Sequence, residues 1–383
     1  MKRSPVLVSA VAIGCVLILN SCSLSHQQWR TIAQQSGLQQ QAEILLREKL
    51  ESISSDGDLA NLPEILQALG KLLESIWGQR EDEVPSDKRL VKYSNDYQAR
   101  AIVDFERGYL RVETVAEENP LEQLRQATVL ALLTPDNLTL DDIFSDSEPQ
   151  LGEVPFLYPQ VLDQDDEPIR YQWRAGRYAD YLIANHLQTR RSEGRTIRYV
   201  QTDLVEEHLH LRSLDYADSV LRYARQYNIA PDLVYAVIEV ESAFNPYAVS
   251  HANALGLMQI VPSTAGRDVF ERIKKLPGEP TRQQLFVADF NIEIGTAYLH
   301  LLDDLYLNRI LHPQSRTYAK ISAYNGGAGN VFRAFSSNRE QAVARINSMT
   351  PQQVYQQLVS THPFAETRNY LRKVQQATAG YQG

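Results

Sequence analysis

The stretch PDLVYAVIEVESAFNP, residues 231–246, decides the fold of the C-terminal half of this chain. Pro231 suits the first position of a helix because it lacks an N–H and its φ angle is already set. Helical periodicity continues through Glu241, and Asn245-Pro246 ends it because a residue before proline disfavours the helical conformation. The stretch therefore predicts an apolar helix that carries a carboxylate near its C-terminal end.

The position of Glu241 on this helix favours an unusual protonation state. At about 100° per residue, one side of the helix is apolar and contains Leu233, Ala236, Val237 and Val240. Glu241 falls at the edge of that side, whereas Glu239 points roughly the opposite way and is expected on the solvated face. Because a half-buried carboxyl loses solvation, we expect its pKa to rise, which suits a general acid. The helix alone also fits a glutamate held in a salt bridge or hydrogen bond.

Three further signatures follow in chain order: GLMQI at 256–260, AYNGG at 323–327 and ETRNY at 366–370. Together with ESAFNP they resemble the lytic transglycosylases, which cleave the sugar strands of bacterial peptidoglycan. The ordered set within one domain-sized stretch is specific, although each signature alone is weak. The resemblance extends through most of the chain after its first residues, including residues 97–105, 173–177 and 261–270.

The region after residue 205 reads as almost wholly helical. Thr281 with Gln284, and Thr350 with Gln353, match the capping-box pattern, and each precedes an apolar-periodic run. The resemblance implies that this region is an all-α, lysozyme-like catalytic domain. The whole chain is then expected to be of the α+β class.

The resemblance implies roles for seven residues. Glu241 matches the catalytic acid and base, and Ser242 the serine beside it that polarises the substrate by hydrogen bonding. Met258 and Gln259 match a cleft-lining pair that offers apolar contact and hydrogen bonds to a sugar. The last three are Tyr324 and Asn325, which orient the glutamate and hold the substrate, and Tyr370, a second tyrosine brought towards the site. The alternative for Tyr370 is a core aromatic on the last helix.

The implied reaction uses one carboxylate and needs no metal or organic cofactor. Glu241 protonates the glycosidic oxygen between MurNAc and GlcNAc, and then removes the proton from the C6 hydroxyl of MurNAc. That hydroxyl attacks C1, so the product is a 1,6-anhydro sugar. The substrate's own acetamido group can stabilise the positive charge at C1, as in substrate-assisted glycosidases.

Two alternative functions remain open at this stage. A muramidase of goose-lysozyme type would use water in place of the C6 hydroxyl, and would need a second carboxylate such as Asp289, Asp303 or Asp304. A non-enzymatic lipoprotein that binds glycan would need no protonated carboxyl. The Glu241-Ser242, Gln259 and Tyr324-Asn325 set argues against the binding protein.

The N-terminus predicts export and lipidation. Lys2 and Arg3 precede an apolar run, residues 6–19, of signal-peptide length. Residues 19–22, Leu-Asn-Ser-Cys, resemble a bacterial lipobox, which makes Cys22 the expected lipidation site; Cys15 is followed by more apolar sequence. Ser23 resembles the residue after the cysteine in lipoproteins sorted to the outer membrane, so we expect a lipid anchor there and a chain that faces the periplasm. The alternatives are a plain secreted protein and an N-terminal helical anchor.

Cysteine content bears on disulfide bonding, and the charge distribution limits the kinds of molecule that the chain is expected to bind. After signal removal Cys22 is the last cysteine, so an intrachain disulfide is not expected. From Val205 onward the chain has 17 Lys+Arg and 16 Asp+Glu, whereas the remainder has 21 and 31. The C-terminal half is thus near neutral and would not strongly repel anionic peptide stems, and neither half carries the basic stripe that nucleic-acid binding requires. Peptidoglycan strands are the expected partner, and other cell-wall proteins are possible partners of the middle region.

The pattern along the chain divides it into four parts. They are residues 1–21, the signal peptide; 22–89, the lipidated N-terminus and a helical segment; 90–204, a mixed α+β accessory domain; and 205–383, the catalytic domain. Within 90–204, we predict a hairpin over 101–115 with its turn at Arg107-Gly108, a helix over 121–133 and a strand over 196–204. A second hairpin is expected around 155–173, followed by a helix over 177–187.

Overall fold

The computed structural model describes residues 40, 44, 46, 62–79, 81, 83–149, 151–152, 154–250 and 252–382. The predicted signal peptide and the lipidation site at Cys22 lie outside these residues. In the part of the chain that is described, no helix combines the length and the hydropathy needed to cross a membrane.

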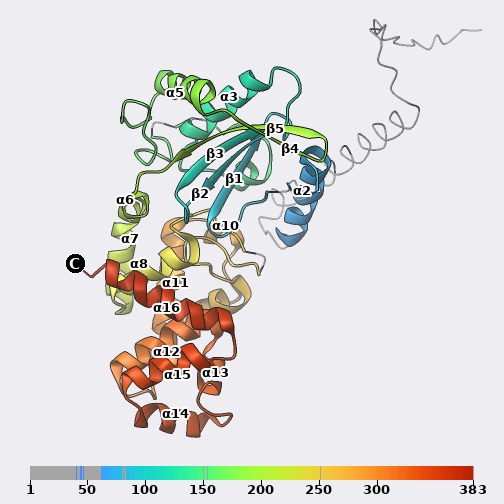
Figure 1. Cartoon of the computed structure of the whole chain (residues 1–383). Coiled ribbons are helices and arrows are strands. Elements are labelled where there is room, and N and C mark those ends of the chain that lie inside the picture. The colour runs from blue at the N-terminus through green and yellow to red at the C-terminus, as the bar shows by residue number, and fades with distance from the viewer. Residues whose placement is uncertain are drawn as a thin grey trace, which may run out of the picture.

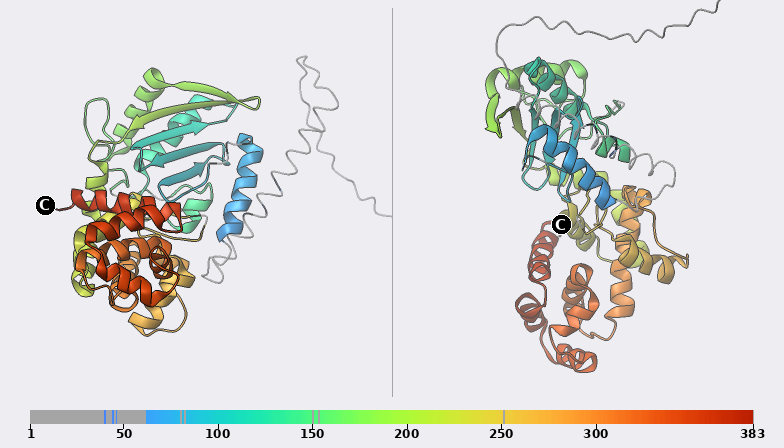
Figure 2. Two further views of the ribbon diagram at one scale, coloured as in Figure 1. Left: turned by 60° about the horizontal axis from the view of Figure 1, so that its bottom comes forward. Right: turned by 90° about the vertical axis from the view of Figure 1, so that its right-hand side faces the viewer.

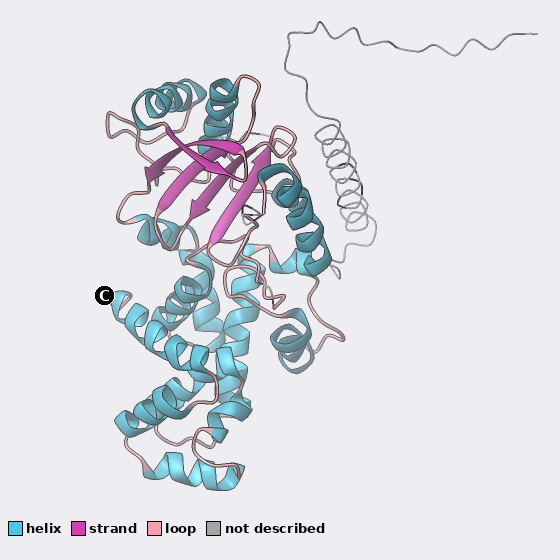
Figure 3. Cartoon of the chain, turned by 45° about the vertical axis from the view of Figure 1, so that its right-hand side comes forward, coloured by secondary structure: helices cyan, strands magenta, loops and turns pink. Residues whose placement is uncertain are grey.

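All strands of the described chain belong to one antiparallel sheet in the N-terminal half, and the C-terminal half is helical (Figure 3). The strand order is β1-β2-β3-β5-β4 (Figure 1). The strands are β1 (Arg89–Ser94), β2 (Ala99–Asp104), β3 (Tyr109–Thr114), β4 (Gln188–Ser192) and β5 (Arg195–Asp203). The α+β prediction is therefore confirmed.

The predicted hairpin is confirmed as β2 and β3. Ala99 pairs with Thr114 and Asp104 with Tyr109, and Gly108 in the turn has φ +70°, which glycine adopts without strain. The strand over 196–204 is confirmed as β5. The edge strands β1 and β4 were not predicted.

Helices flank this sheet. α3 (Pro120–Leu133) confirms the predicted helix and packs with α5 (Gln172–His186) on one face of the sheet. α2 (Leu62–Trp77) lies beside the sheet (Figure 2), and the short helix α4 (Leu140–Phe144) contacts β1. The sequence placed the start of α5 five residues too late.

The second predicted hairpin, around 155–173, is wrong. Within this segment the structure contains only isolated bridges, such as that between Leu162 and Pro168. Asp163 organises the turn instead, because its Oδ1 accepts hydrogen bonds from the backbone N–H groups of Asp165 and Glu167. Side-chain capture of the backbone thus replaces strand pairing in this segment.

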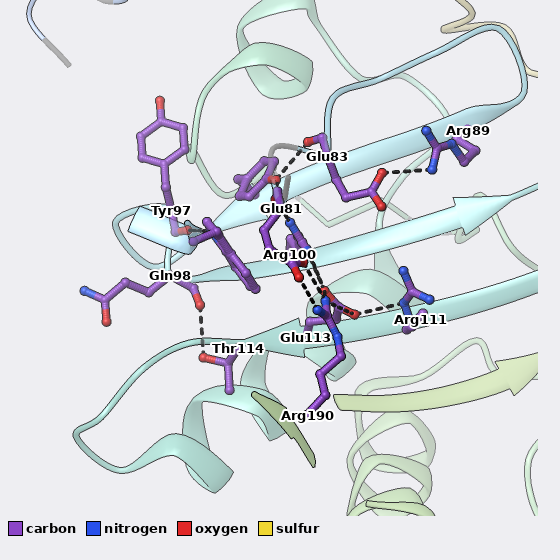
Figure 4. Close-up of polar contacts among 12 residues, drawn as sticks. Glu81, Glu83, Arg89, Tyr97, Gln98, Arg100, Arg111, Glu113, Thr114 and Arg190 are labelled. Atoms are coloured by element: carbon purple, nitrogen blue, oxygen red, sulfur yellow. Dashed lines mark hydrogen bonds and ion pairs between the residues drawn. The ribbon is translucent and has the colours of Figure 1, made fainter. Parts of the chain in front are cut away.

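A buried cluster of charges joins α2 and the segment after it to the sheet (Figure 4). The Arg100 guanidinium, fully buried, lies 2.5 Å from the Glu113 carboxylate and 3.9 Å from the ring centroid of Trp77. Glu81 and Arg190 complete the cluster, and Arg190 pairs with both Glu81 and Glu113. Each buried charge therefore has an opposite partner, which burial of a charge requires.

The C-terminal half is helical. Its helices are α6 (His208–Asp215), α7 (Ala217–Tyr227), α8 (Pro231–Ser242), α9 (Arg267–Val269), α10 (Arg282–Leu285), α11 (Ala288–Leu301), α12 (Pro313–Gly326), α13 (Ala328–Arg333), α14 (Arg339–Ser348), α15 (Pro351–Thr361) and α16 (Ala365–Gly380). Among them, α8 packs against α7 and α16. Short π-helical turns cover Pro262–Gly266, Phe270–Lys274 and Leu302–Tyr306. The predicted helix of residues 231–241 is confirmed as α8, and both predicted capping boxes are present.

The two halves share one hydrophobic core. Arg212 of α6, fully buried, packs against the rings of both Phe105 and Phe156 and donates hydrogen bonds to the carbonyl of Phe244 at 3.2 and 2.5 Å. The hydroxyl of Tyr247 contacts the backbone of residues 136 and 138. The segment that follows α8 is thus held by the N-terminal half of the chain.

Candidate active site

Glu241 lies in the last turn of α8, where the backbone changes direction sharply. Ala243 and Phe244 both have left-handed φ angles, of 49° and 59°, and end the helix. The side chain of Asn245 then accepts a hydrogen bond from the N–H of Tyr247 at 3.1 Å. This turn leaves Glu241 half-buried at the end of an apolar helix, as the sequence predicted.

The environment of Glu241 keeps its carboxyl protonated at neutral pH. Burial raises its pKa from the ordinary value of 4.5 to about 8. The hydroxyl of Tyr370 and the charge of Lys88 oppose this rise in pKa, and the negative charges of Asp87 and Glu366 add to it. The expected elevation of the pKa of Glu241 is therefore present, and desolvation is its largest cause.

Two tyrosines lie close enough to this carboxyl to interact with its charge. Tyr370 of α16 is 6% exposed, and its buried Oη, next to Glu241, makes no hydrogen bond of standard geometry within the described residues. The Tyr324 hydroxyl donates a hydrogen bond to the carbonyl of Met258 at 2.8 Å. Burial, together with the charge of Glu241, raises the pKa of both tyrosines well above 10. Both hydroxyls are therefore neutral donors in the physiological pH range.

Buried polar groups hold the loop that contains GLMQI in place next to α8. Asn291 of α11, fully buried, accepts from the N–H of Met258 and donates to the carbonyls of Leu255 and Leu285, all at 2.8 Å. Gly256 has φ +71°, and a Cβ there would overlap the Asn291 side chain. The glycine is thus required for close approach of the loop to α11.

The structure places two of the predicted substrate-binding residues, Ser242 and Met258, in the core. Ser242 is fully buried, and its hydroxyl contacts the carbonyls of Ile238 at 3.0 Å and Leu257 at 2.7 Å. Met258 is also fully buried, against Gly295 of α11. Helix packing leaves neither side chain an exposed surface. Both side chains instead connect α8, the loop and α11.

Gln259 is partly exposed, unlike its neighbour Met258. It is half-buried, and its Nε2 donates to the carbonyl of Gly256 at 3.0 Å. Among the described residues its Oε1 accepts no hydrogen bond, which leaves an acceptor for a sugar hydroxyl or amide. This arrangement fits the predicted role of Gln259.

Asn325 joins the end of α12 to the start of α16. Its Oδ1 accepts from the Thr367 hydroxyl at 2.6 Å, and its Nδ2 donates to Glu366 at 3.3 Å. A Cβ at Gly326 would overlap the side chains of His362 and Thr367, so only glycine permits this approach. The contact brings Tyr324 and Tyr370, which are far apart in sequence, to the same carboxyl.

Sequence reasoning missed the contribution of the segment that precedes β1. The carbonyls of Ser86 and Asp87 accept long hydrogen bonds from Asn245 Nδ2, at 3.4 and 3.3 Å, and Ser86 also accepts from the N–H of Val249. This brings Asp87 and Lys88 close enough to change the pKa of Glu241. Local pattern contains no signal for this contact, because about 150 residues separate the two segments.

Two of the three acidic residues considered as a second carboxylate are engaged elsewhere. Asp289 accepts hydrogen bonds from the hydroxyls of Ser219 and Tyr223. Asp303 lies 3.6 Å from the ammonium of Lys320.

Glu239 is not a simple surface residue, because it is half-buried and accepts a hydrogen bond from Tyr381 at 2.7 Å.

Comparison with known proteins assigns each half of the chain to a family model. Residues 55–215 match the model for the N-terminal domain of membrane-bound lytic murein transglycosylase C. Residues 218–347 match the transglycosylase SLT domain.

Similar proteins include the membrane-bound lytic murein transglycosylase C of Yersinia pestis (strain Pestoides F) and that of Yersinia pseudotuberculosis serotype I (strain IP32953). Each is 45% identical over 310 residues, which are 81% of this chain and 86% of the relative. Among solved structures, an inactive mutant of lytic transglycosylase Slt from Pseudomonas aeruginosa is 29% identical over 43% of this chain and 24% of that chain, with a TM-score of 0.33. A TM-score this low does not establish a shared overall fold.

Proposed function

The chain belongs to the membrane-bound lytic murein transglycosylase C family and is a peptidoglycan lytic transglycosylase, and from this premise we propose that Glu241 performs its acid–base chemistry. The observation that carries the proposal is a carboxyl with a pKa of about 8 at the end of α8, close to two neutral tyrosines. A general acid works best when its pKa lies near the working pH.

The proposed first step is protonation of the glycosidic oxygen between MurNAc and GlcNAc by Glu241. The C1–O bond breaks, positive charge develops at C1, and the 2-acetamido carbonyl of the substrate stabilises it. Glu241 is then ionised in a desolvated environment, and the otherwise unpartnered hydroxyl of Tyr370 can donate a hydrogen bond to it. This donor limits the cost of charging the carboxyl.

In the second step, the Glu241 carboxylate removes the proton of the MurNAc C6 hydroxyl as that oxygen attacks C1. The proton lost in the first step is thereby recovered, and the product carries a 1,6-anhydro ring. Gln259 contributes a free acceptor for the sugar. Ser242, Met258 and Asn325 act as positioning residues in this scheme, since their polar groups or side chains are engaged within the protein.

We further propose that the protein is anchored in the outer membrane through a lipid on Cys22 and faces the periplasm. The lipobox-like residues 19–22 support this, as does the description of the relatives as membrane-bound. We also propose that the accessory domain is bounded near residues 90 and 205, since β1 begins at Arg89 and β5 ends at Asp203. Replacement of Cys22 by serine is expected to move the protein from the membrane to the soluble fraction; unchanged membrane association would contradict lipidation.

The function is tested by mass spectrometry of peptidoglycan digested with residues 23–383. We expect muropeptides lighter by one water than the products of a muramidase. Glu241→Gln is expected to lower the rate by about 10²–10⁴-fold. Glu239→Gln is the matched control on the same helix and should retain activity.

Two outcomes would contradict the proposal. MurNAc with a reducing end would mean that water attacks C1, as in the muramidase alternative. Full activity of Glu241→Gln would show that another group donates the proton.

A further inference from the structure

A cavity of about 360 Å³ opens in the helical domain, next to the candidate active site but distinct from it. Its walls include the aromatic side chains of Tyr298, Tyr306 and Phe332, and Arg333 and Arg339 lie at its edge. The ring of Tyr298 contacts that of Tyr324 at a centroid distance of 5.6 Å. Through this pair of rings the cavity adjoins the groups around Glu241.

The two arginines of the cavity have no carboxylate partner among the described residues. Arg333 donates to the side chain of Asn330 at 3.1 Å, and Arg339 to the carbonyl of Tyr306 at 3.3 Å. The Arg339 guanidinium also lies 5.0 Å from the ring centroid of Phe332. Both side chains are exposed, so both guanidinium groups retain donors for a ligand.

The acidic residues nearby form their ion pairs with other cations. Asp268, the one acid in the lining, accepts from the Tyr306 hydroxyl at 2.8 Å and pairs with Arg272 at 3.3 Å. Glu340, which follows Arg339 in sequence, forms an ion pair with Arg309. The cavity therefore combines aromatic walls with two guanidinium groups that form no ion pair with a carboxylate of the described residues.

A ligand for this cavity should carry a carboxylate beside an apolar or flat group. Planar guanidinium groups bind carboxylates through paired hydrogen bonds, and the aromatic walls offer apolar contact. The GlcNAc and MurNAc rings of a peptidoglycan strand have neutral hydroxyl and acetamido groups, whereas its peptide stems carry carboxylates. The stem is therefore the part of the substrate that matches the cavity.

We propose that this cavity binds a carboxylate of a peptide stem on the strand being cleaved, through Arg333 and Arg339. The proposal rests on the assignment of peptidoglycan as substrate. It makes the cavity a specificity site for stem-bearing strands, separate from the proton transfer at Glu241.

The test measures binding of two labelled glycan strands to the Glu241→Gln protein. One strand keeps its peptide stems, and the other is the same strand after an amidase has removed the stems and the lactyl carboxylates so exposed on MurNAc have been converted to methylamides. The variant Arg333→Gln/Arg339→Gln is expected to bind the stem-bearing strand about tenfold more weakly, the effect of about 1.4 kcal/mol, and the bare strand unchanged. Arg191→Gln/Arg198→Gln, on β4 and β5, removes the same charge elsewhere and should change neither affinity.

The proposal fails if the unmodified cavity does not prefer the stem-bearing strand, or if the cavity variant weakens both strands equally or neither. Thermal unfolding of each variant establishes that the fold is intact. If Glu241→Gln still cleaves the strands, the acid–base assignment fails instead. The ratio of KM values for the two strands, measured with Glu241 present, then tests the cavity independently.

Discussion

Single residues around Glu241 determine the pH range in which its proton is available. The desolvated carboxyl binds its proton more tightly than an ordinary glutamate, so the acid form persists up to about pH 8. Asp87 and Glu366 strengthen proton binding through like charge, and Lys88 weakens it. Two of these three charges come from the segment before β1, so that segment takes part in setting the protonation of the proposed catalytic carboxyl.

The first prediction concerns the pH dependence of kcat/KM. Because the protonated form of Glu241 is the active one, activity should fall as the pH rises through about 8, and not near 4.5. Asp87→Asn removes a negative charge that raises the pKa of Glu241, so it should move this fall to lower pH. Lys88→Gln should move it to higher pH. Turnover of solubilised glycan strands between pH 5 and 10 measures these shifts, and shifts of the opposite sign would contradict the assignment.

At the scale of elements, the active site depends on the junction between α8, the 256–260 loop and α11. Asn291 satisfies three backbone groups at once, and Ser242 ties the end of α8 to Leu257. Buried polar groups without partners are costly, so this junction is stable only while the amide is present.

The second prediction follows from that junction. Asn291→Ala leaves the N–H of Met258 and two carbonyls without partners, which should cost at least about 1–3 kcal/mol of the free energy of unfolding. Urea denaturation measures the loss. Asn308→Ala, at an exposed position, should change stability by less than about 0.5 kcal/mol. Equal effects of the two substitutions would show that the junction is not stabilised in this way.

The charge cluster beneath α2 gives a third prediction. Glu113→Gln removes the negative charge that faces the fully buried Arg100, and should destabilise the protein by about 3–5 kcal/mol. The exposed pair of Arg309 and Glu340 provides the contrast, because solvent screens it and Glu340→Gln should leave the stability nearly unchanged. Thermal unfolding of both variants compares them. A small effect at Glu113 would mean that Glu81 alone balances the buried arginine.

At the scale of the whole molecule, the two halves are coupled through the segment that follows Glu241. Arg212 packs against two rings of the N-terminal half and donates a hydrogen bond to the carbonyl of Phe244, and Asn245 binds the backbone of residues 86 and 87. A continuous core runs through both halves. We therefore expect them to unfold together.

The fourth prediction tests this coupling with two probes. All three tryptophans precede residue 205, so their fluorescence reports on the N-terminal half, whereas far-ultraviolet circular dichroism is dominated by the helical C-terminal half. The two unfolding curves should coincide in the unmodified protein. Arg212→Met removes hydrogen bonds to Phe244 and should separate them, while Arg225→Met, on the exposed face of α7, should not. Separate transitions in the unmodified protein would contradict the coupling.

Local patterns determined the features that depend on neighbouring residues. Pro231 and Asn245-Pro246 mark the ends of α8, the alternating faces of residues 101–115 located the hairpin, and both capping boxes formed as predicted. These features were predictable because they reflect backbone preferences within one turn or strand. The ordered signatures identified the family. The pattern failed around 155–173, where the Asp163 side chain binds the backbone and replaces strand pairing.

Only the tertiary structure decided which predicted site residues face the carboxyl and which belong to the core. Ser242 and Met258 are fully buried because α11 packs over the loop, whereas Tyr370 reaches Glu241 because Asn325 ties α12 to α16. Asp87 joins the site across about 150 residues of sequence. The physical reason is that burial and electrostatic potential depend on distances in space between residues that are far apart in sequence. The sequence by itself determined the helix, its carboxylate and the family to which the chain belongs.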